Sequence, residues 1–388
     1  MTIVQGHCDQ QFSALEELFA SKLANGDELG ASIVINVNGT NVVDIWGGHA
    51  DAAHSQPWTR DTITNVWSST KTIAALAVLI AHDRGLLDVD QPVSKYWPEF
   101  AANGKESVLV RHVLSHSSGV SGWETPLLGE QVADLTLTTS LLAQQAPWWE
   151  PGTASGYHMV NFGHMLGELI KRVTGLSMKD FVAKEIAGPL NADFQIGALE
   201  KDWARVATLI EPPPANIDFS KMDPKGPALK TFSNPLLSVP TVAESWWRKA
   251  DLPGVNGHTN ARGLNTILSA ISNGGVVNGK QVLSQKTIDL IWREQTSGPD
   301  LVIGLPLRYG IGYGLGGGAT AQSLPWLASE DFCFWGGYGG SWEVMDRKRH
   351  VTFTYVMNKM GSGILGNERT VEYVELVWKI LGEAISTK

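Results

Sequence analysis

The residues best suited to chemistry in this sequence are Ser68 and Lys71, which stand three positions apart in the stretch Ser-Ser-Thr-Lys. Apolar spacing predicts a helix over residues 70–82, so both side chains project from one face of its first turn. The unpaired N–H groups at that helix end can stabilise a developing anion. A lysine desolvated by neighbours such as Trp67 can act as the base that activates a serine. The pattern indicates a serine nucleophile; the alternative is a helix-capping serine beside a solvated lysine.

Two later segments also carry side chains that suit an active site. Residues 156–163 read Gly-Tyr-His-Met-Val-Asn-Phe-Gly and follow a tryptophan pair at 148–149. Residues 335–341 read Trp-Gly-Gly-Tyr-Gly-Gly-Ser, on a predicted strand where glycines let a backbone or a ligand approach closely. Together with Ser68, they supply a nucleophile, a phenol and a glycine-rich strand from three distant parts of the chain.

Other motifs point to chemistry that we do not expect. The GxGxxG pattern at 312–317 has no convincing helix start behind it, and the one at 361–366 lies 22 residues from the end, too few for a dinucleotide fold. His112 and His116 are four apart but lack a third metal ligand nearby in sequence. The sequence contains no GxSxG, so the nucleophile elbow of the α/β-hydrolases is absent. We expect neither a metal nor an organic cofactor.

The sequence resembles the serine hydrolases of the class C β-lactamase and penicillin-binding fold, and most of all their carboxylesterase branch, called family VIII. The resemblance covers roughly residues 10 to 385. The stretches that carry it are Pro57-Trp58-Thr59, Val66 to Lys71, Arg84-Gly85-Leu86-Leu87-Asp88, Tyr96-Trp97-Pro98-Glu99-Phe100, Leu114-Ser115-His116-Ser117-Ser118-Gly119 and Tyr157-His158.

The resemblance implies a role for each residue of the site. Ser68 is the acylated nucleophile and Lys71 its partner. Tyr157 opens the second motif and serves as a phenolate or shared-proton base, which titrates together with Lys71. The backbone N–H groups of Ser68 and Tyr338 form the oxyanion hole.

Two departures from the family pattern bear on the substrate. In β-lactamases and DD-peptidases the third motif starts with lysine, where this chain has Trp335, and Met159 replaces the Asn of the second motif. Losing a cation and an amide weakens recognition of an anionic amide and favours a neutral ester. His158 and Asn161 can equally be structural residues at a helix start. The candidate substrate-binding residues are Trp335, Gly336, Gly337, His158, Asn161, Trp123 and Trp149.

The order of predicted elements favours an α+β fold, with an antiparallel sheet flanked by helices and a helical insert, as in β-lactamases and transpeptidases. An Asn-Gly pair between the β-branched runs 31–37 and 42–46 predicts a hairpin. Helices are predicted over residues 9–24, 70–82, 107–116, 132–145, 161–174, 177–186, 260–273 and 368–383, and further strands over 309–315, 331–335, 341–346 and 350–357.

We expect one catalytic unit over residues 10–385. Residues 1–85 and 262–388 form its α/β part, and residues 86–261 form the mainly helical insert. The proline-rich stretch 211–257 shows little periodicity and is expected to be a long ordered loop over a cleft.

Composition excludes several classes of protein. The formal charge of −9 and the lack of a basic run argue against nucleic-acid binding. There is no signal-peptide pattern, no apolar run of 18 residues and only two cysteines, so we expect a cytoplasmic protein without membrane contact. Tryptophan supplies 15 of the 33 aromatic residues, a surplus that indicates an aromatic acyl pocket as well as core packing. The oligomeric state stays open.

The predicted function is a serine carboxylesterase that hydrolyses small neutral esters through an acyl-enzyme on Ser68. An acyltransferase that uses the same site on a natural-product alcohol is the first alternative. A β-lactamase or peptidase with weak β-lactam hydrolysis is the second. A binding module that retains the fold without catalysis is the third.

Overall fold

The computed structural model describes residues 4–214 and 222–382, and within them the largest element is a nine-stranded antiparallel sheet. Its strand order is β1-β3-β2-β14-β13-β12-β11-β10-β9. The strands span Gln5–Cys8 (β1), Gly30–Val37 (β2), Thr40–Gly48 (β3), Thr296–Pro299 (β9), Pro306–Tyr309 (β10), Gly314–Leu315 (β11), Phe332–Gly336 (β12), Trp342–Asp346 (β13) and Val351–Met357 (β14). The sheet therefore joins the first strands of the chain to the last.

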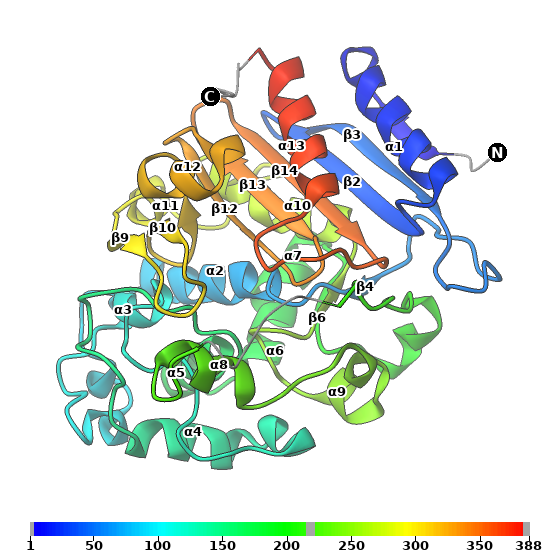
Figure 1. Cartoon of the computed structure of the whole chain (residues 1–388). Helices are drawn as coiled ribbons and strands as arrows, with labels where there is room; N and C mark the ends of the chain where they lie inside the picture. Colours follow the sequence, from blue (N-terminus) through cyan, green and yellow to red (C-terminus); the bar gives the residue numbers. More distant parts are fainter. Residues whose placement is uncertain (1–3, 215–221, 383–388) are drawn as a thin grey trace.

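Helices cover both faces of this sheet (Figure 1). The helices α1 (Ser13–Asn25) and α13 (Glu368–Ile380) lie on one face, and α10 (Ala261–Ser272) packs against β2, β13 and β14. Burial on both sides explains why β2 and β14 are long runs of apolar and β-branched residues. This layered arrangement confirms the predicted α+β fold class.

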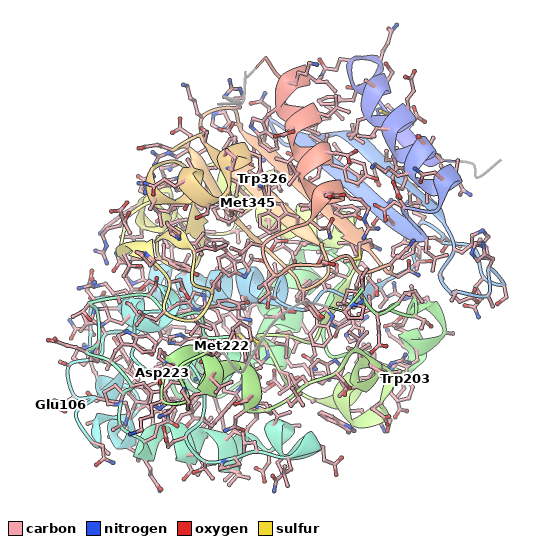
Figure 2. All side chains as sticks on the ribbon, viewed as in Figure 1. Glu106, Trp203, Met222, Asp223, Trp326 and Met345 are labelled. Carbon is pink, nitrogen blue, oxygen red and sulfur yellow. The ribbon has the colours of Figure 1, made fainter. Side chains whose placement is uncertain are left out.

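The helix α2 (Thr70–Asp83) runs between the sheet and the helical half of the molecule (Figure 1). Residues 70–81 are all buried, because α2 contacts α10 and α11 on one side and α5 on the other. Figure 2 shows side chains filling the space between the sheet and the helices beneath it. The start of α2 is therefore enclosed by both halves of the fold.

Most elements between residues 86 and 261 are helical. The α-helices there are α3 (Val110–Leu114), α4 (Leu135–Gln144), α5 (Asn161–Thr174), α6 (Met178–Phe181), α7 (Gly188–Leu190), α8 (Pro227–Ser233) and α9 (Ser245–Lys249), and α11 (Gln285–Ile291) and α12 (Gly318–Ser323) follow later. The 3₁₀ turns span Gln10–Phe12, Val93–Lys95, Pro98–Ala101, Gly129–Ala133, Glu200–Arg205, Val239–Ala243 and Pro325–Leu327, and Val182–Ala187 is a π-helix.

Two small sheets complete the fold. A three-stranded sheet has the order β4-β6-β5, with β4 at Thr64–Asn65, β6 at Gly257–Thr259 and β5 at Phe194–Ile196. The strands β7 (Val276–Val277) and β8 (Lys280–Gln281) form a hairpin. Because β4 ends just before Ser68, the three-stranded sheet fixes the chain that leads into the start of α2.

The structure corrects three of the predicted elements. The single strand predicted over 309–315 is two strands, β10 and β11, joined by a turn at Gly310, where a Cβ atom would lie 1.9 Å from the carbonyl oxygen of Ile291. The described part of 211–257 contains α8 and α9, which are too short to show a helical period; residues 215–221 of this loop lie outside the described residues. The helix α12 follows the glycine-rich stretch 312–317, where we expected no helix start.

Other predicted elements are confirmed within a few residues. The helices α1, α2, α5, α10 and α13 lie where the apolar spacing predicts them. The strands β2 and β3 pair antiparallel around the Asn38-Gly39 turn, and β12, β13 and β14 match the predicted strands. Among the described residues, no helix combines the length and the apolar character needed to cross a membrane.

Candidate active site

The segment around Ser68 turns sharply between β4 and α2. Trp67 has a φ of 46°, a left-handed conformation that is unusual for a bulky side chain and is typical of functional sites. Its carbonyl oxygen accepts hydrogen bonds from Thr70 N at 3.0 Å and from Thr70 Oγ1 at 2.5 Å. The Thr70 hydroxyl also accepts a hydrogen bond from Gly257 N at 2.8 Å, which anchors the turn to β6. These contacts place Ser68 at the amino end of α2.

Lys71 is buried with three oxygen atoms around its amine. Its Nζ lies 3.0 Å from Ser68 Oγ, 2.7 Å from Met159 O and 2.8 Å from Gly254 O. Gly254 O reaches the amine because its loop packs on Gly163 of α5, where a Cβ atom would lie 2.3 Å from Gly254 N. No carboxylate contributes to these contacts, so the amine is held by neutral dipoles.

Tyr157 completes a group of three side chains around one oxygen atom. Its hydroxyl donates a hydrogen bond to Ser68 Oγ at 2.6 Å, and its ring lies 5.0 Å from Lys71 Nζ. Tyr157 stands 89 residues from Ser68, on a segment without helix or strand that leads into α5. The structure thus brings together the three residues that the sequence predicts as catalytic.

Burial favours the uncharged forms of both partners of Ser68. It lowers the pKa of Lys71 well below its ordinary value and raises the pKa of Tyr157. For Tyr157 the hydrogen bond to Ser68 opposes burial, whereas the nearby carboxyl groups of Asp300 and Glu343 add to the rise in pKa. Burial therefore favours a neutral amine and a neutral phenol before the reaction starts.

Two backbone N–H groups beside Ser68 are free to bind an oxyanion. Within the described residues, neither Ser68 N nor Tyr338 N donates a hydrogen bond. The turn after β12 lies close to the segment that leads into Ser68, because Gly337 packs on Val66. The N–H of Gly337 donates to Ser341 O at 2.8 Å, within the same turn. The predicted oxyanion pair thus has two unused donors next to the nucleophile.

Trp335 lies inside an aromatic cluster and does not form an open pocket. It is 3% exposed, and its ring centroid lies 5.2 Å from that of Tyr157, 5.7 Å from that of Tyr309 and 5.8 Å from that of His116. The indole therefore supports the back of the Tyr157 ring. A second aromatic group, Trp67 with Trp247 and Tyr338, lies on the nucleophile's own segment and at the oxyanion turn.

The remaining candidate substrate-binding residues have partners within the protein. His158 is buried, with Nε2 2.6 Å from Ser118 Oγ and Nδ1 2.6 Å from Gly156 O, and burial lowers its pKa to about 3. Asn161, the first residue of α5, donates from Nδ2 to Val120 O at 2.8 Å. Both contacts match the structural alternative considered for these two residues.

Trp123 and Trp149 are likewise held by the protein. Trp123 is buried in the helical half, where its indole donates to Thr138 O at 3.0 Å and its ring contacts His164. The indole of Trp149 donates to Ala154 O at 2.9 Å, and its ring packs against Gly156. Gly336 is the last residue of β12. The structure brings none of these side chains into hydrogen-bond contact with Ser68.

Three residues near the site had no predicted role in it, although His116 lies in one of the stretches that carry the family resemblance. Asp300 and His116 contact the Tyr157 segment directly. Glu343 pairs with Trp335 across β12 and β13, is fully buried, and has no hydrogen-bond partner for either carboxyl oxygen within the described residues. Only the pairing of distant segments in the fold shows that these three residues lie beside the site.

Comparison with known proteins gives consistent matches over nearly the whole chain. A family model described as Beta-lactamase matches residues 15–374. The Esterase/beta-lactamase LipL of Mycobacterium tuberculosis is 30% identical over 375 residues, which cover 93% of this chain and 84% of that protein. A crystal structure of a family VIII carboxylesterase is similar with a TM-score of 0.90 and 35% identity, covering 97% of this chain and all of that one. A penicillin-binding protein homologue from Caulobacter crescentus gives a TM-score of 0.89 and 33% identity, covering 98% of this chain and 100% of its own.

Proposed function

The chain belongs to the Beta-lactamase family, and on that premise we propose that it is a serine carboxylesterase that hydrolyses small neutral esters through an acyl-enzyme on Ser68. The observation that carries this proposal is the environment of one atom. Ser68 Oγ lies 3.0 Å from Lys71 Nζ and 2.6 Å from the hydroxyl of Tyr157. An alcohol so placed has a base to remove its proton and an acid to protonate the leaving group.

Lys71 acts as the base in the acylation step. Its neutral amine has two N–H groups, which bind Met159 O and Gly254 O, and its lone pair faces Ser68 Oγ. The amine takes the serine proton while Oγ forms a bond to the ester carbonyl carbon. The carbonyl oxygen becomes an oxyanion, which the N–H groups of Ser68 and Tyr338 stabilise.

Tyr157 acts as the acid when the alcohol leaves. The tetrahedral intermediate collapses, the bond from carbon to the leaving oxygen breaks, and the phenol donates its proton to that oxygen. The ammonium of Lys71 then gives its extra proton to the phenolate of Tyr157, so that both side chains are neutral again. Water repeats the sequence on the acyl-enzyme, so that the carboxylic acid leaves and Ser68 regains its proton.

The surroundings of Ser68 support a neutral substrate. Trp335 stands where related β-lactamases carry a lysine, and its indole is enclosed by other rings. Lys71 is the one basic side chain that the described contacts place on Ser68 Oγ, and burial favours its neutral form. A substrate carboxylate would lose its hydration there without gaining a cationic side chain to pair with, whereas an uncharged acyl group has no such cost.

Ser68→Ala tests the proposal with short-chain p-nitrophenyl esters. The variant should lose nearly all hydrolysis, and a serine-directed phosphonate should add its mass to Ser68 of the parent protein only. Ser69→Ala is the matched control, because the neighbouring hydroxyl contacts Ser341 and not the nucleophile; it should retain most of the activity. Hydrolysis by Ser68→Ala, or an adduct on another residue, would overturn the proposal.

Analysis of the products tests whether water or an added alcohol accepts the acyl group. We expect the free acid as the main product when a competing alcohol is present, because the proposal has water attack the acyl-enzyme. An ester of the added alcohol as the main product would make the protein an acyltransferase. Turnover of a chromogenic cephalosporin at the rate of the esters would instead favour a β-lactamase.

A further inference from the structure

The segment that carries Tyr157 has no regular structure to fix its position. Residues 155–158 belong to no helix or strand, and α5 starts only at Asn161. Yet the phenol oxygen must stay within hydrogen-bond distance of Ser68 Oγ, where it lies 2.6 Å away. The side chain can be held so closely only if contacts from other parts of the chain fix its backbone.

Two residues from distant segments supply these contacts. Gly156 N donates to His116 O at 2.8 Å, Tyr157 N donates to Asp300 Oδ1 at 3.0 Å, and His158 N donates to His116 Nδ1 at 3.0 Å. Three consecutive backbone N–H groups are thus bound in turn by His116, Asp300 and His116. Neither residue touches Ser68 Oγ.

Asp300 is itself held in one position. It is 1% exposed, and Oδ1 also accepts hydrogen bonds from the backbone N–H groups of Val302 and Ile303, each at 2.9 Å. The next residue, Leu301, donates from its N–H to Ser155 O at 2.8 Å. The loop after β9 and the Tyr157 segment are therefore tied together at two adjacent points.

His116 is held just as firmly. It is buried and has a φ of 58°, in the left-handed region. Its ring centroid lies 5.0 Å from that of Tyr157 and 4.8 Å from that of Phe162. Burial lowers the pKa of His116 well below its ordinary value, which keeps Nδ1 available as a hydrogen-bond acceptor.

We propose that Asp300 and His116 are positioning residues, which hold the backbone of residues 156–158 so that the phenol of Tyr157 stays on Ser68 and the ester is turned over. This inference rests on the proposed esterase function. Both residues act through Tyr157 and contact no substrate, so their removal should slow turnover and leave substrate binding almost unchanged.

Asp300→Ala and Asp300→Asn form the first test. Loss of the acceptor frees Tyr157 N, and a displacement of the phenol by about 1 Å lowers kcat about 100-fold, with KM within about 3-fold of the parent. Asparagine keeps an acceptor oxygen in the same place, so Asp300→Asn should recover at least 10-fold of that loss. Asp300→Asn as slow as Asp300→Ala would contradict a role through the hydrogen bond to Tyr157.

Asp346, the last residue of β13, offers a matched control. It is also fully buried, and its Oδ1 accepts hydrogen bonds from the backbone N–H groups of Lys348 and Arg349 at 2.9 and 3.0 Å. Asp346→Ala loses the same kind of contact without touching the Tyr157 segment. Its kcat should stay within about 3-fold of the parent once the folded fraction is measured by circular dichroism.

His116 gives an independent pair of variants. Asparagine tolerates a left-handed backbone and places an acceptor oxygen near the position of Nδ1, so His116→Asn should keep most of the turnover. His116→Leu removes the acceptor and should lower kcat at least 10-fold more than His116→Asn. If Asp300→Ala does not fold, Asp300→Asn and the two His116 variants decide the outcome.

The results separate this inference from the function on which it rests. A parent protein that hydrolyses no ester, or that keeps its activity as Ser68→Ala, would refute the esterase proposal itself. With an active parent, an Asp300→Ala variant whose kcat falls no further than that of Asp346→Ala would overturn the positioning role alone. A loss of binding, with KM raised and kcat unchanged, would overturn it as well.

Discussion

Gly337 packs so closely on Val66 that a Cβ atom at Gly337 would lie 2.1 Å from the carbonyl oxygen of Val66. The contact joins the turn after β12 to the segment that leads into Ser68. It also sets the distance between the two N–H groups assigned to the oxyanion hole, because Tyr338 is the next residue in the turn. The absence of a side chain at Gly337 therefore determines where the proposed oxyanion donor, Tyr338 N, lies.

Gly337→Ala should lower kcat for ester hydrolysis by about 100-fold, the usual cost of removing one oxyanion donor. The added methyl group must push the turn away from Val66, and Tyr338 N moves with it. Steady-state kinetics check this expectation. Gly167→Ala is the control, because a Cβ atom at that helical glycine meets only ordinary contacts beyond 3.6 Å; full activity of Gly337→Ala would contradict the assignment of the oxyanion hole.

Tyr157→Phe should remove the general acid and leave the packing around it intact. The ring keeps its contacts with Trp335 and His116, and only the hydroxyl that donates to Ser68 Oγ is lost. We expect kcat to fall by about 100-fold or more while the thermal unfolding midpoint changes little. If turnover survived, Lys71 alone would carry the proton transfers.

Lys71→Met should change how stability depends on pH. Burial lowers the pKa of Lys71 when the protein is folded, so between that pKa and about 10.5 the unfolded chain binds a proton that the folded protein does not. The unfolding free energy contributed by this group therefore rises with pH, by at most about 1.4 kcal/mol per pH unit. In urea titrations from pH 7 to 9 the parent should gain stability relative to Lys71→Met. Parallel curves would mean that Lys71 is protonated in the folded state.

Glu343→Gln should produce the opposite slope. Burial raises the pKa of Glu343 well above 4.5, and the nearby hydroxyl of Ser69 opposes it only in part. Above about pH 4.5 the unfolded chain loses a proton that the folded protein keeps, so the parent loses stability as the pH rises toward the folded pKa. The amide does not titrate. Unfolding midpoints from pH 5 to 8 should therefore favour Glu343→Gln increasingly, and a constant difference would refute a neutral buried acid.

The sequence was sufficient to predict the three residues that meet at the nucleophile. Ser68 and Lys71 share one helical turn, so their contact follows from local spacing. Tyr157 could be named only by resemblance to a family, because 89 residues separate it from Ser68. The helices and the β2–β3 hairpin were also predictable, since their apolar periods and turn residues are local signals.

Residues that act across the fold were beyond the reach of the sequence. Asp300 meets Tyr157 over a separation of 143 residues, and no spacing or composition links the two. The role of Trp335 was also misjudged: we expected it to line an acyl pocket, and the structure encloses it between Tyr157, His116 and Tyr309. A tryptophan in a glycine-rich motif gives no sign of which side of the strand it occupies.

The pairing of β2 with β14 has a consequence for how the protein is made. Residues 31–37 leave the ribosome early, but their partners in the sheet, residues 351–357, are synthesised about 320 positions later. Until then β2 lacks one of its two neighbouring strands. The strand β12, which leads to Tyr338, is connected to β2 only through β13 and β14. A nascent chain thus carries Ser68 and Lys71 for most of its synthesis before the last strands, which complete the sheet, have been made.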